Sequence, residues 1–364
     1  MAFPSSLPTA RSRDPLRAPT LRWGILGPGW IAERFVPSLK ENTRQEIVAV
    51  GGARSHAKVL AFAERWGIPK ACPSAEELVG DPAIDAVYVA TPHHRHFPDT
   101  LAAIEAGKHA LVEKPLTLNA AEAKKLAEAA RRKGVLLMEA YWTDFLPKFD
   151  VLRQVLADGV LGEIHTVLAD HGEHFGPGHR IMRADMAGGP LLDLGTYPVA
   201  FATKVLGPPR KVLASGQWAP SGVNGQASIL LSHEGDAQSV LHTTLFGHTP
   251  CQAVVAGSRG TLTIPGSFYA PGNFHIADND NLVRLEYREE PNRYQQLYHE
   301  AVHFAACVGE GLRESPIRPL ADSIVTLETL DEVRRQLGIV FDEERSSRLE
   351  GTYGHGSSPV GRGP

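Results

Sequence analysis

One short stretch, Ala110-Leu111-Val112-Glu113-Lys114-Pro115, constrains the fold more than any other part of the chain. Its apolar first half, with β-branched Val112, predicts a buried strand. Proline fixes its own φ and disfavours the α region for the residue before it, so the strand must end at Lys114. A glutamate and a lysine therefore follow the carboxyl end of a strand, which is the edge where open α/β sheets bind their ligands.

The surrounding chain alternates predicted strands and helices from residue 21 to about residue 142. Such alternation is typical of a parallel, doubly wound sheet with right-handed crossovers. We expect strands over 21–26, 46–52, 84–90, 110–113 and 135–139. We expect helices over 57–66, 100–106 and 120–133, the last capped by Asn119. One further helix ends at residue 39 and another begins at residue 75.

The turn after the first predicted strand reads Gly27-Pro28-Gly29-Trp30-Ile31-Ala32. In a dinucleotide site with this G-x-G-x-x-A pattern, the first glycine permits a tight turn and the second lets the backbone approach a diphosphate. The alternative is a merely tight turn. We expect the cofactor's diphosphate at the helix N-terminus, beside Gly27, Gly29, Trp30 and Ile31.

No acidic residue ends the second predicted strand, where an NAD-selective site usually places Asp or Glu for the ribose 2′-hydroxyl. Arg54 and Ser55 stand there instead, and a guanidinium pairs bidentately with a phosphate. The alternative is a solvated arginine in a turn. The missing acid favours NADP as the cofactor, with NAD second.

Histidines gather in two places in the sequence. Metal sites usually add carboxylates at fixed spacing or a helical pattern such as HExxH, and neither is present. We therefore expect no metal site. Thr91, Pro92 and one histidine of the first group should lie beside the nicotinamide, and the other histidines should be solvated. The two groups are His93, His94 and His96, and His171, His174 and His179.

Length and composition exclude several classes of protein. The 364 residues suggest about two domains, and 43% hydrophobic with 21% charged residues can bury a sizeable core. The scattered net charge of −4 gives no footprint for nucleic acid, and no apolar run approaches the ~20 residues of a membrane span. Three separated cysteines, Cys72, Cys251 and Cys307, fit a reducing cytoplasm.

The two ends of the chain lack hydrophobic periodicity. Residues 1–20 are rich in proline and arginine, and residues 341–364 become charged and then rich in Gly, Ser and Pro. We predict a disordered tail at each end. For the first, the alternative is an arm that packs on a partner subunit.

Five motifs, in register along the chain, together resemble the glucose–fructose oxidoreductase/inositol dehydrogenase (Gfo/Idh/MocA) family. The resemblance covers about residues 21–338, and within the family it is nearest to the branch of dimeric dihydrodiol dehydrogenase and NADP-dependent D-xylose 1-dehydrogenase. The motifs are Gly24-x-x-Gly27-x-Gly29-x-x-Ala32, Ala90-Thr91-Pro92-x-x-x-His96, Ala106-Gly107-Lys108-His109-x-x-x-Glu113-Lys114-Pro115, Met138-Glu139-Ala140-Tyr141-Trp142, and the run from Ala187 to Pro198.

The resemblance implies an α/β fold in which an N-terminal Rossmann domain, residues 21–142, precedes a C-terminal α+β domain, residues 143–340. That second domain would carry an open, mostly antiparallel sheet whose outer face often forms an oligomer interface, so we expect a homo-oligomer. The residue pattern agrees on its own. It predicts strands over 162–170, 212–217, 227–232, 239–245, 252–257, 260–264 and 282–287, and helices over 294–308 and 321–337, the last packing back on the first domain.

The resemblance also implies that Lys114, Asp193 and Tyr197 surround the reacting carbon. Free tyrosine titrates near ~10, and a neighbouring ammonium favours its phenolate. We assign Tyr197 as the acid/base and Lys114 as its activator, with Lys114 itself as the alternative proton acceptor. Asp193 would orient Lys114 or bind a hydroxyl, while Glu113 and His96 would seat the nicotinamide ribose.

The spacing of Asp193 and Tyr197, i and i+4, would place them on one face of a helix, although Pro198 suggests that the helix begins near Tyr197. The loop 171–183, with His174 and Arg183, would line the substrate side. Trp142 and Phe145 would stack on a sugar or fill the core.

The leading function is thus an NADP-dependent dehydrogenase of an aldose or a cyclic diol, with a small-molecule substrate. One alternative is a non-catalytic, cofactor-sensing regulator of the same fold. The other is a reductase of a non-sugar substrate. Fold alone does not decide among them.

Overall fold

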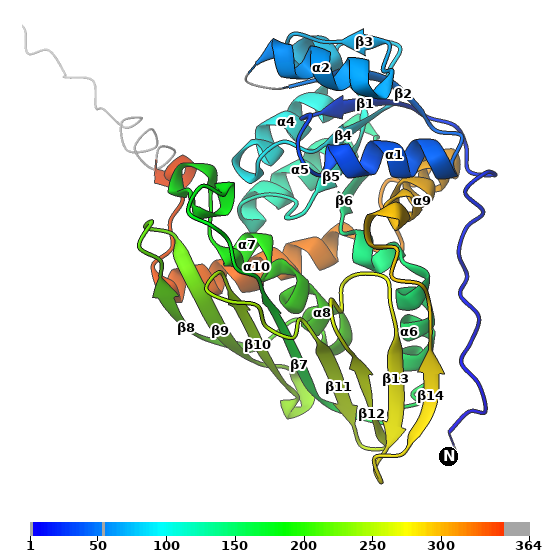
Figure 1. Ribbon diagram of the computed structural model, residues 1–364, viewed down its shortest axis with the longest axis vertical. Coiled ribbons are helices and arrows are strands. Elements are labelled where there is room, and N and C mark those ends of the chain that lie inside the picture. The colour runs from blue at the N-terminus through cyan, green and yellow to red at the C-terminus, as the bar shows by residue number, and fades with distance from the viewer. Residues whose placement is uncertain (1–2, 53–54, 346–364) are drawn as a thin grey trace, which may run out of the picture.

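The first half of the chain forms a six-stranded parallel sheet. The computed structural model describes residues 3–52 and 55–345, and the order of the first sheet is β3-β2-β1-β4-β5-β6 (Figure 1). The order reverses next to β1, which confirms the predicted doubly wound Rossmann arrangement. The strands are β1 (Arg22–Leu26), β2 (Glu46–Gly51), β3 (Lys70–Ala71), β4 (Ala86–Val89), β5 (His109–Glu113) and β6 (Leu137–Ala140).

Helices cover both faces of this sheet. Apolar side chains of α1, α2 and α9 join the core on one face, and those of α3, α4 and α5 join the core on the other. The predicted cap of α5 is confirmed, because the Asn119 side chain accepts a hydrogen bond from the backbone N–H of Glu122. The bounds are α1 (Ala32–Asn42), α2 (His56–Trp66), α3 (Ala75–Val79), α4 (His93–Glu105), α5 (Ala120–Lys133) and α9 (Tyr298–Gly309).

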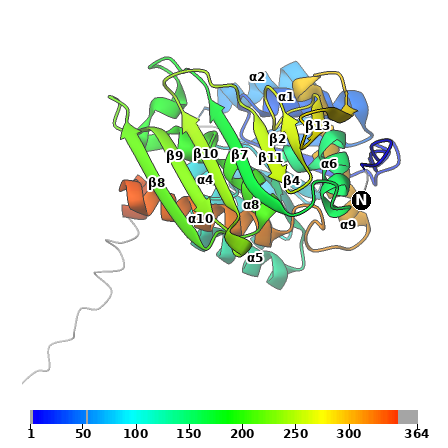
Figure 2. The same ribbon diagram turned by 90° about the horizontal axis from the view of Figure 1, so that it is seen from below.

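The second half forms an eight-stranded sheet in the order β14-β13-β12-β11-β7-β10-β9-β8. Only the pair β7 and β10 is parallel, so the predicted open, mostly antiparallel sheet is confirmed. Helices α8 and α10 lie behind one face, and the other face is open in the described part of the chain (Figure 2). The strands are β7 (Ile164–Gly172), β8 (Lys211–Trp218), β9 (Asn224–Ser232), β10 (Gln238–Thr244), β11 (Ala253–Gly257), β12 (Gly260–Ile264), β13 (Phe274–Asp278) and β14 (Val283–Tyr287).

The remaining helices belong to the second half of the chain, and one of them packs between the two sheets. Helix α10 packs against both α5 and α8, so it lies between the two halves of the molecule. These helices are α6 (Pro147–Ala157), α7 (Pro190–Asp193), α8 (Thr196–Leu206) and α10 (Leu320–Leu337), with short 3₁₀ turns η1 (Trp142–Phe145), η2 (Arg180–Met182) and η5 (Arg293–Gln296). No helix in the described ranges is both long and apolar enough to cross a membrane.

Several elements differ from the predictions. Strand β3 and helix α6 are absent from the predicted set. Helix α4 begins at His93, seven residues before the predicted start, with Pro92 in an extended conformation at its N-cap. The three histidines and Pro98 hid its first turns, because they lack apolar periodicity. Strand β13 was absent from the predicted set, although its buried Phe274 and Ile276 alternate with half-buried His275.

Residues predicted as tails make specific contacts where the structure describes them. Residues 3–20 run in an extended path beside α6 and α9, with ion pairs from Arg11 to Asp150 (3.2 Å) and from Arg13 to Glu310 (2.5 Å). At the other end Glu344 pairs with Arg334 of α10 (2.8 Å). The first segment thus differs from the flexible tail that its composition suggested. Residues 346–364 lie outside the described part.

Trp23 of β1 ties the first sheet to the C-terminal half. Its ring is fully buried and lies 5.2 Å from the ring of Phe304 in α9 and 6.1 Å from that of Phe35 in α1. Its indole N–H donates to Oε1 of Gln45 at 2.9 Å. One core cluster therefore runs from this face of the Rossmann sheet to the inner face of the second sheet.

We expect Trp23→Phe to lower the free energy of unfolding by about 1–3 kcal/mol, because a buried hydrogen bond and part of a packed ring are lost. Urea denaturation measures this. The control is Trp218→Phe, at a half-exposed residue of β8, for which we expect a change below about 0.5 kcal/mol. Equal effects of the two substitutions would contradict this role of Trp23.

Candidate active site

The glycine loop between β1 and α1 forms a backbone cradle. Gly27 adopts φ +101°, and its N–H donates to the carbonyl of Gly51 at 2.9 Å. A Cβ on Gly27 would lie 2.7 Å from the carbonyl oxygen of Ala90, so only glycine fits. The loop leads directly into the N-terminus of α1, where the helix dipole favours an anion. This geometry fits the diphosphate of a dinucleotide.

The structure places three of the other predicted cofactor residues near the ends of α1 and α2. Trp30 is 57% exposed, and the guanidinium of Arg34 lies 4.1 Å from the centre of its ring. Ile31 is half-buried at the N-cap of α1, and Ser55 is exposed at the N-cap of α2. Arg54, the predicted contact for a 2′-phosphate, lies outside the described residues.

Lys114 and Asp193 meet at the carboxyl end of β5. The Lys114 ammonium donates to Oδ1 of Asp193 at 3.0 Å and to its backbone carbonyl at 2.7 Å. The guanidinium of Arg180, in η2, donates to Oδ2 of Asp193 at 2.9 Å. Two cations thus share one buried carboxylate, and the Lys114 side chain remains 13% exposed.

The two cations determine the charge of Asp193. Burial raises the pKa of this carboxyl, but attraction to Lys114 and then to Arg180 outweighs burial and holds that pKa well below its ordinary range. His93 also faces the carboxylate, and burial lowers its pKa well below 6.5. Asp193 is therefore a carboxylate at neutral pH.

Tyr197 is close to Lys114, but the surroundings of its hydroxyl do not favour a phenolate. The ammonium lies 5.0 Å from the centre of the Tyr197 ring. The hydroxyl accepts a hydrogen bond from the indole N–H of Trp142 at 3.1 Å, and burial raises the pKa of Tyr197 well above 10. In this environment the phenol keeps its proton, because desolvation of a phenolate outweighs the attraction of one ammonium.

Asp193 and Tyr197 do not lie on one face of a single helix, as their spacing suggested. Asp193 ends α7, and Tyr197 lies in the first turn of α8 after a break at Leu194 and Gly195. The two residues are thus brought to Lys114 by two short helices rather than by one helix face.

Glu113 sits beneath Lys114 in a buried acid cluster. Its Oε1 accepts from the hydroxyl of Tyr88 at 2.5 Å, and its Oε2 accepts from the backbone N–H of Lys114 at 3.2 Å. Burial raises the pKa of Glu113 to about 7. Burial, with Glu113 nearby, raises the pKa of Glu300 well above 4.5, and neither of its oxygens has a hydrogen-bond partner among the described residues.

His96 has a structural environment. Its ring is buried, with Nδ1 2.7 Å from the carbonyl oxygen of Pro115 and Nε2 2.8 Å from that of Thr91. These contacts hold the turn after β5 against the turn after β4 and use both ring nitrogens. Across the described ranges, no group of three or more His, Cys, Asp or Glu residues is arranged to bind a metal ion.

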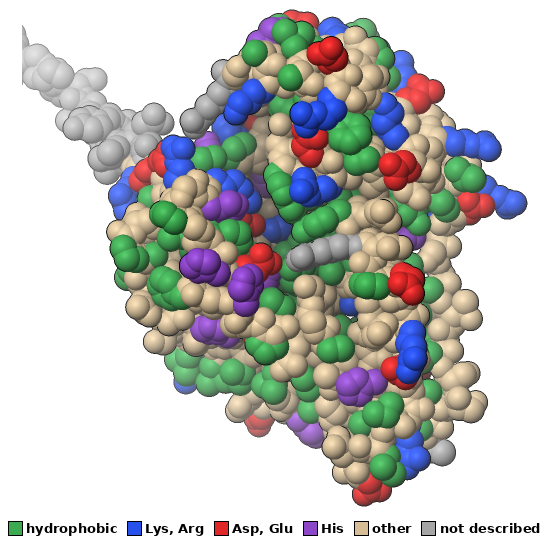
Figure 3. Space-filling model, viewed as in Figure 1, with side chains coloured by type: hydrophobic (Ala, Val, Ile, Leu, Met, Phe, Trp, Pro, Cys, Tyr) green, Lys and Arg blue, Asp and Glu red, His purple; other side chains and the backbone are tan. Residues whose placement is uncertain are grey.

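The substrate side differs in detail from the prediction. Arg183 is engaged with Asp185 (2.5 Å), and His174 is exposed on the loop after β7. Trp142 and Phe145 are buried, so both belong to the core, and Trp142 holds the Tyr197 hydroxyl as well. The space-filling view shows histidine side chains gathered beside the hollow below the Rossmann sheet (Figure 3).

A second polar group adjoins Tyr197. The Tyr269 ring stacks on Tyr197 at 4.3 Å and on His171 at 4.4 Å. Oε1 of Glu173 lies 3.0 Å from Nε2 of His171 and accepts from the Tyr269 hydroxyl at 3.3 Å. Lys148 supports this group from below, because its buried ammonium donates to the carbonyls of Phe268 and Ala270 on either side of Tyr269.

Sequence reasoning missed Arg180, Glu173 and Tyr269. Glu173 continues the inward-facing alternation of β7, a signal that the pattern contained. Arg180 lies in a loop with several arginines and histidines, and only the fold selects the one that reaches Asp193.

Comparisons with known proteins agree with this geometry. Residues 21–141 match the model of the GFO/IDH/MocA oxidoreductase family, NAD-binding Rossmann fold, and residues 149–263 match the GFO/IDH/MocA C-terminal domain. The chain is 36% identical over 340 residues to trans-1,2-dihydrobenzene-1,2-diol dehydrogenase of Mus musculus, with 89% of this chain and 99% of the relative covered. The Xenopus tropicalis enzyme of the same name is 34% identical over 327 residues, with 88% and 99% covered.

A solved structure with a similar fold is the 3-ketoreductase from Actinomadura kijaniata in complex with NADP and TDP-benzene. It has a TM-score of 0.77 and 28% identity, with 87% of this chain and 98% of that chain covered. An aldose-aldose oxidoreductase from Caulobacter crescentus, 24% identical with a TM-score of 0.76 over 87% of this chain and 97% of that one, shares the fold. Both domains match, the relatives are covered almost end to end, and the chain therefore belongs to the GFO/IDH/MocA family of oxidoreductases.

Proposed function

We propose that this oxidoreductase is an NADP-dependent dehydrogenase that interconverts a ring hydroxyl and a ketone or lactone on a carbohydrate or a cyclic diol. The observation that carries the proposal is the chain of charges Lys114, Asp193 and Arg180 at the end of β5, beside the glycine cradle. A charged donor held at a sheet edge next to a dinucleotide site is what hydride transfer to or from a carbonyl carbon requires.

Separate groups of residues would bind the cofactor and the substrate oxygen. Gly27, Gly29 and the N-terminus of α1 would hold the diphosphate, and Glu113 the nicotinamide ribose. When bound, the nicotinamide supplies the hydride acceptor or donor. Lys114 uses two of its three N–H donors on Asp193, so the third can bind the substrate oxygen.

The proton is assigned to Tyr197. Its hydroxyl accepts from Trp142, so its own proton is directed elsewhere. Burial raises its pKa and keeps the hydroxyl protonated, so it can give its proton to the forming alkoxide during ketone reduction. In the oxidation direction Tyr197 would first have to release its own proton to solvent, and the resulting phenolate, with Lys114 stabilising its negative charge, would then accept the substrate proton. Lys114 remains the alternative acceptor in that direction.

The substrate class rests on polar groups and on the relatives. Asp193, Glu173 and Tyr269 offer acceptors and donors for several hydroxyls around one reacting carbon. The curated relatives are named for a benzene dihydrodiol, and the similar solved ketoreductase carries NADP and a TDP ligand. These observations favour a hydroxylated ring over an imine or another non-sugar substrate.

We also propose a homo-oligomer in a reducing cytoplasm. Cross-strand pairing aligns Leu213, Leu230, Val240, Leu168 and Val254 in one apolar row across five strands of the open sheet. Of these, Leu168, Leu213 and Val240 are between 43% and 51% exposed. A second copy covering this row would bury it, since contiguous exposed apolar patches mark interaction sites. The three cysteines are free and buried.

The function is tested by initial rates at the NADPH absorbance band with D-xylose, D-glucose, myo-inositol and a trans-dihydrodiol, each with NADP and with NAD. We expect Lys114→Met to lower kcat about 100- to 1,000-fold, because a charged donor to the reacting oxygen is lost. The matched control is Lys124→Met, at an exposed lysine of α5 that pairs with Glu328, for which kcat should stay unchanged.

Other outcomes select the alternatives. Cofactor binding without turnover of any panel member would favour the cofactor-sensing regulator. Turnover that is limited to imines or other non-sugar carbonyls would favour the reductase.

The preference for NADP is tested at Arg54. We expect Arg54→Gln to raise KM for NADP about tenfold or more, since a charge-assisted pair with the 2′-phosphate is lost, while KM for NAD stays the same. Arg44→Gln, an exposed arginine just before β2, is the control. A wild-type enzyme that already prefers NAD would refute this assignment.

Glu113 gives a pH dependence. Its raised pKa of about 7 means that the carboxyl is protonated below pH 7 and becomes a carboxylate, able to accept two ribose hydrogen bonds, above it. We therefore expect Kd for NADP to fall about threefold to tenfold between pH 6 and pH 8. Fluorescence titration measures this.

Glu113→Gln should remove most of that change and leave only the part that comes from the 2′-phosphate itself, which titrates near ~6. Glu76→Gln, at an exposed residue of α3, should behave as the wild type. A Kd profile identical in wild type and Glu113→Gln would remove Glu113 from the cofactor site.

A further inference from the structure

Arg318 is a buried cation that the proposed reaction does not use. It lies in the segment between α9 and α10, and its side chain is 1% exposed. Its Nε and Nη2 donate to Oε2 of Glu139 at 3.1 and 2.7 Å, and Nη1 lies 3.7 Å from Oδ2 of Asp144. The plane of the guanidinium covers the Tyr141 ring at 4.5 Å. One side chain therefore contacts three residues at the end of β6.

The first of these contacts leads to Lys114. Oε1 of Glu139 accepts from the backbone N–H of Leu116 at 2.9 Å, two residues after Lys114. The other oxygen of Glu139 accepts from Arg318 and from the hydroxyl of Ser323, at 2.6 Å. Glu139 is thus fixed from the C-terminal segment on one side, and it holds the turn that carries Lys114 on the other.

The second contact leads to Tyr197. The Tyr141 hydroxyl donates to the backbone carbonyl of Tyr197 at 3.2 Å, and the two rings lie 5.4 Å apart. Tyr141 therefore holds the first turn of α8, while Arg318 holds the ring of Tyr141.

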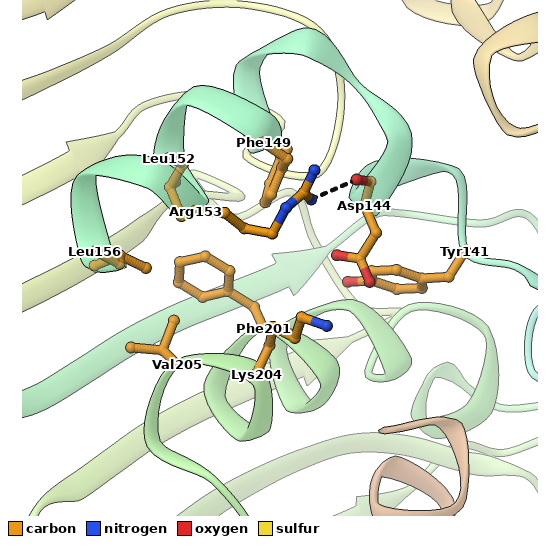
Figure 4. Close-up of a pocket in the computed structure, with 9 residues that line it drawn as sticks. All are labelled: Tyr141, Asp144, Phe149, Leu152, Arg153, Leu156, Phe201, Lys204 and Val205. Carbon is orange, nitrogen blue, oxygen red and sulfur yellow. Dashed lines mark hydrogen bonds between the residues drawn. The ribbon is translucent and has the colours of Figure 1, made fainter. Parts of the chain in front are cut away.

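Tyr141 also borders a cavity. Tyr141 and Asp144 form one end of this cavity of about 160 Å³ between α6 and α8 (Figure 4). The rest of its lining combines apolar side chains, such as Phe149 and Phe201, with the cations Arg153 and Lys204. Beside this cavity, the Tyr141 side chain is held by the Arg318 guanidinium and by its contacts with Tyr197.

Arginine suits this place better than lysine. A planar guanidinium can donate to a carboxylate along its edge and stack on an aromatic ring with its face, whereas an ammonium is a point charge. Its single charge faces two buried carboxylates, Glu139 and Asp144. Removing it would leave both without their principal cation.

We propose that Arg318 is a positioning residue for hydride transfer: through Glu139 and Tyr141 it fixes the Lys114 turn and the first turn of α8 relative to each other. This inference rests on the proposed function, because Lys114 and Tyr197 matter as a pair only if both meet the substrate oxygen.

The test compares Arg318→Met and Arg318→Lys with Arg334→Met. Arg334 is a matched control, a buried arginine of α10 that pairs with Asp331 and Glu344 and covers the ring of Phe341 at 4.8 Å. Two quantities are measured: kcat and KM with the best substrate of the panel, and the hydrogen exchange of the Leu116 amide.

We expect Arg318→Met to lower kcat about 10- to 100-fold with KM for NADP nearly unchanged, since a shift of about 1 Å between reacting groups has effects of that size. Exchange of the Leu116 amide should quicken about tenfold or more. Arg318→Lys should recover part of kcat. Arg334→Met should lose stability and change neither kcat nor the exchange of Leu116.

A kcat within about threefold of wild type in Arg318→Met, with slow Leu116 exchange, would overturn the proposal. Equal losses of kcat in Arg334→Met would do so too, because the effect would then be general destabilisation. If Arg318→Met does not fold, the double variant Arg318→Met/Glu139→Gln removes the cation together with the carboxylate to which it donates, and normal kcat in that variant is the refuting result.

The exchange measurement separates this inference from the proposed function. A wild-type protein without turnover on any substrate would refute the dehydrogenase. Rapid Leu116 exchange in Arg318→Met, but not in Arg334→Met, would still establish the anchoring of the turn.

Discussion

The contact between Lys114 and Asp193 is the constraint on which the rest of the site depends. It joins the first residue after β5 of the Rossmann sheet to a short helix of the second domain, through two hydrogen bonds of 2.7 and 3.0 Å. Each charge would be costly alone in so buried a place, and each is tolerated because the other is there. The two domains must therefore be held in register, and Trp23 packing on Phe304 in α9 and Arg318 binding Glu139 both do so.

Burial determines which groups of the site are protonated, and the protonated groups determine the net charge that faces the substrate oxygen. Arg180 and Lys114 bring two positive charges, and Asp193 cancels one of them. Tyr197 adds no negative charge, because its desolvated hydroxyl stays protonated. The remaining positive charge and a neutral proton donor suit an oxygen on which negative charge develops. A site built around a phenolate would have cancelled that charge before the substrate arrived.

Local signals predicted the parts of the fold that local chemistry determines. The glycine loop, the end of β5 at the proline, and the Asn119 cap each depend on a few adjacent residues. The roles of Arg180 and Arg318 were not predicted. Both residues lie in irregular segments, and only the tertiary structure determines which carboxylate each guanidinium meets. The charge state of Tyr197 was out of reach for the same reason: its proximity to Lys114 followed from the motifs, whereas the desolvation that keeps it protonated is a property of the packed site.

Strand β7 shows how the second domain serves several purposes at once. Its odd-numbered residues, Val167, Ala169 and His171, face the core and lead to Glu173 beside Tyr197. Its even-numbered residue Leu168 lies in the apolar row of the open face. Because alternate residues of a strand point to opposite faces, a slip of one residue would exchange these roles throughout the strand. The register that β7 shares with β10 and β11 therefore fixes the core, the wall beside Tyr197 and the outer surface together.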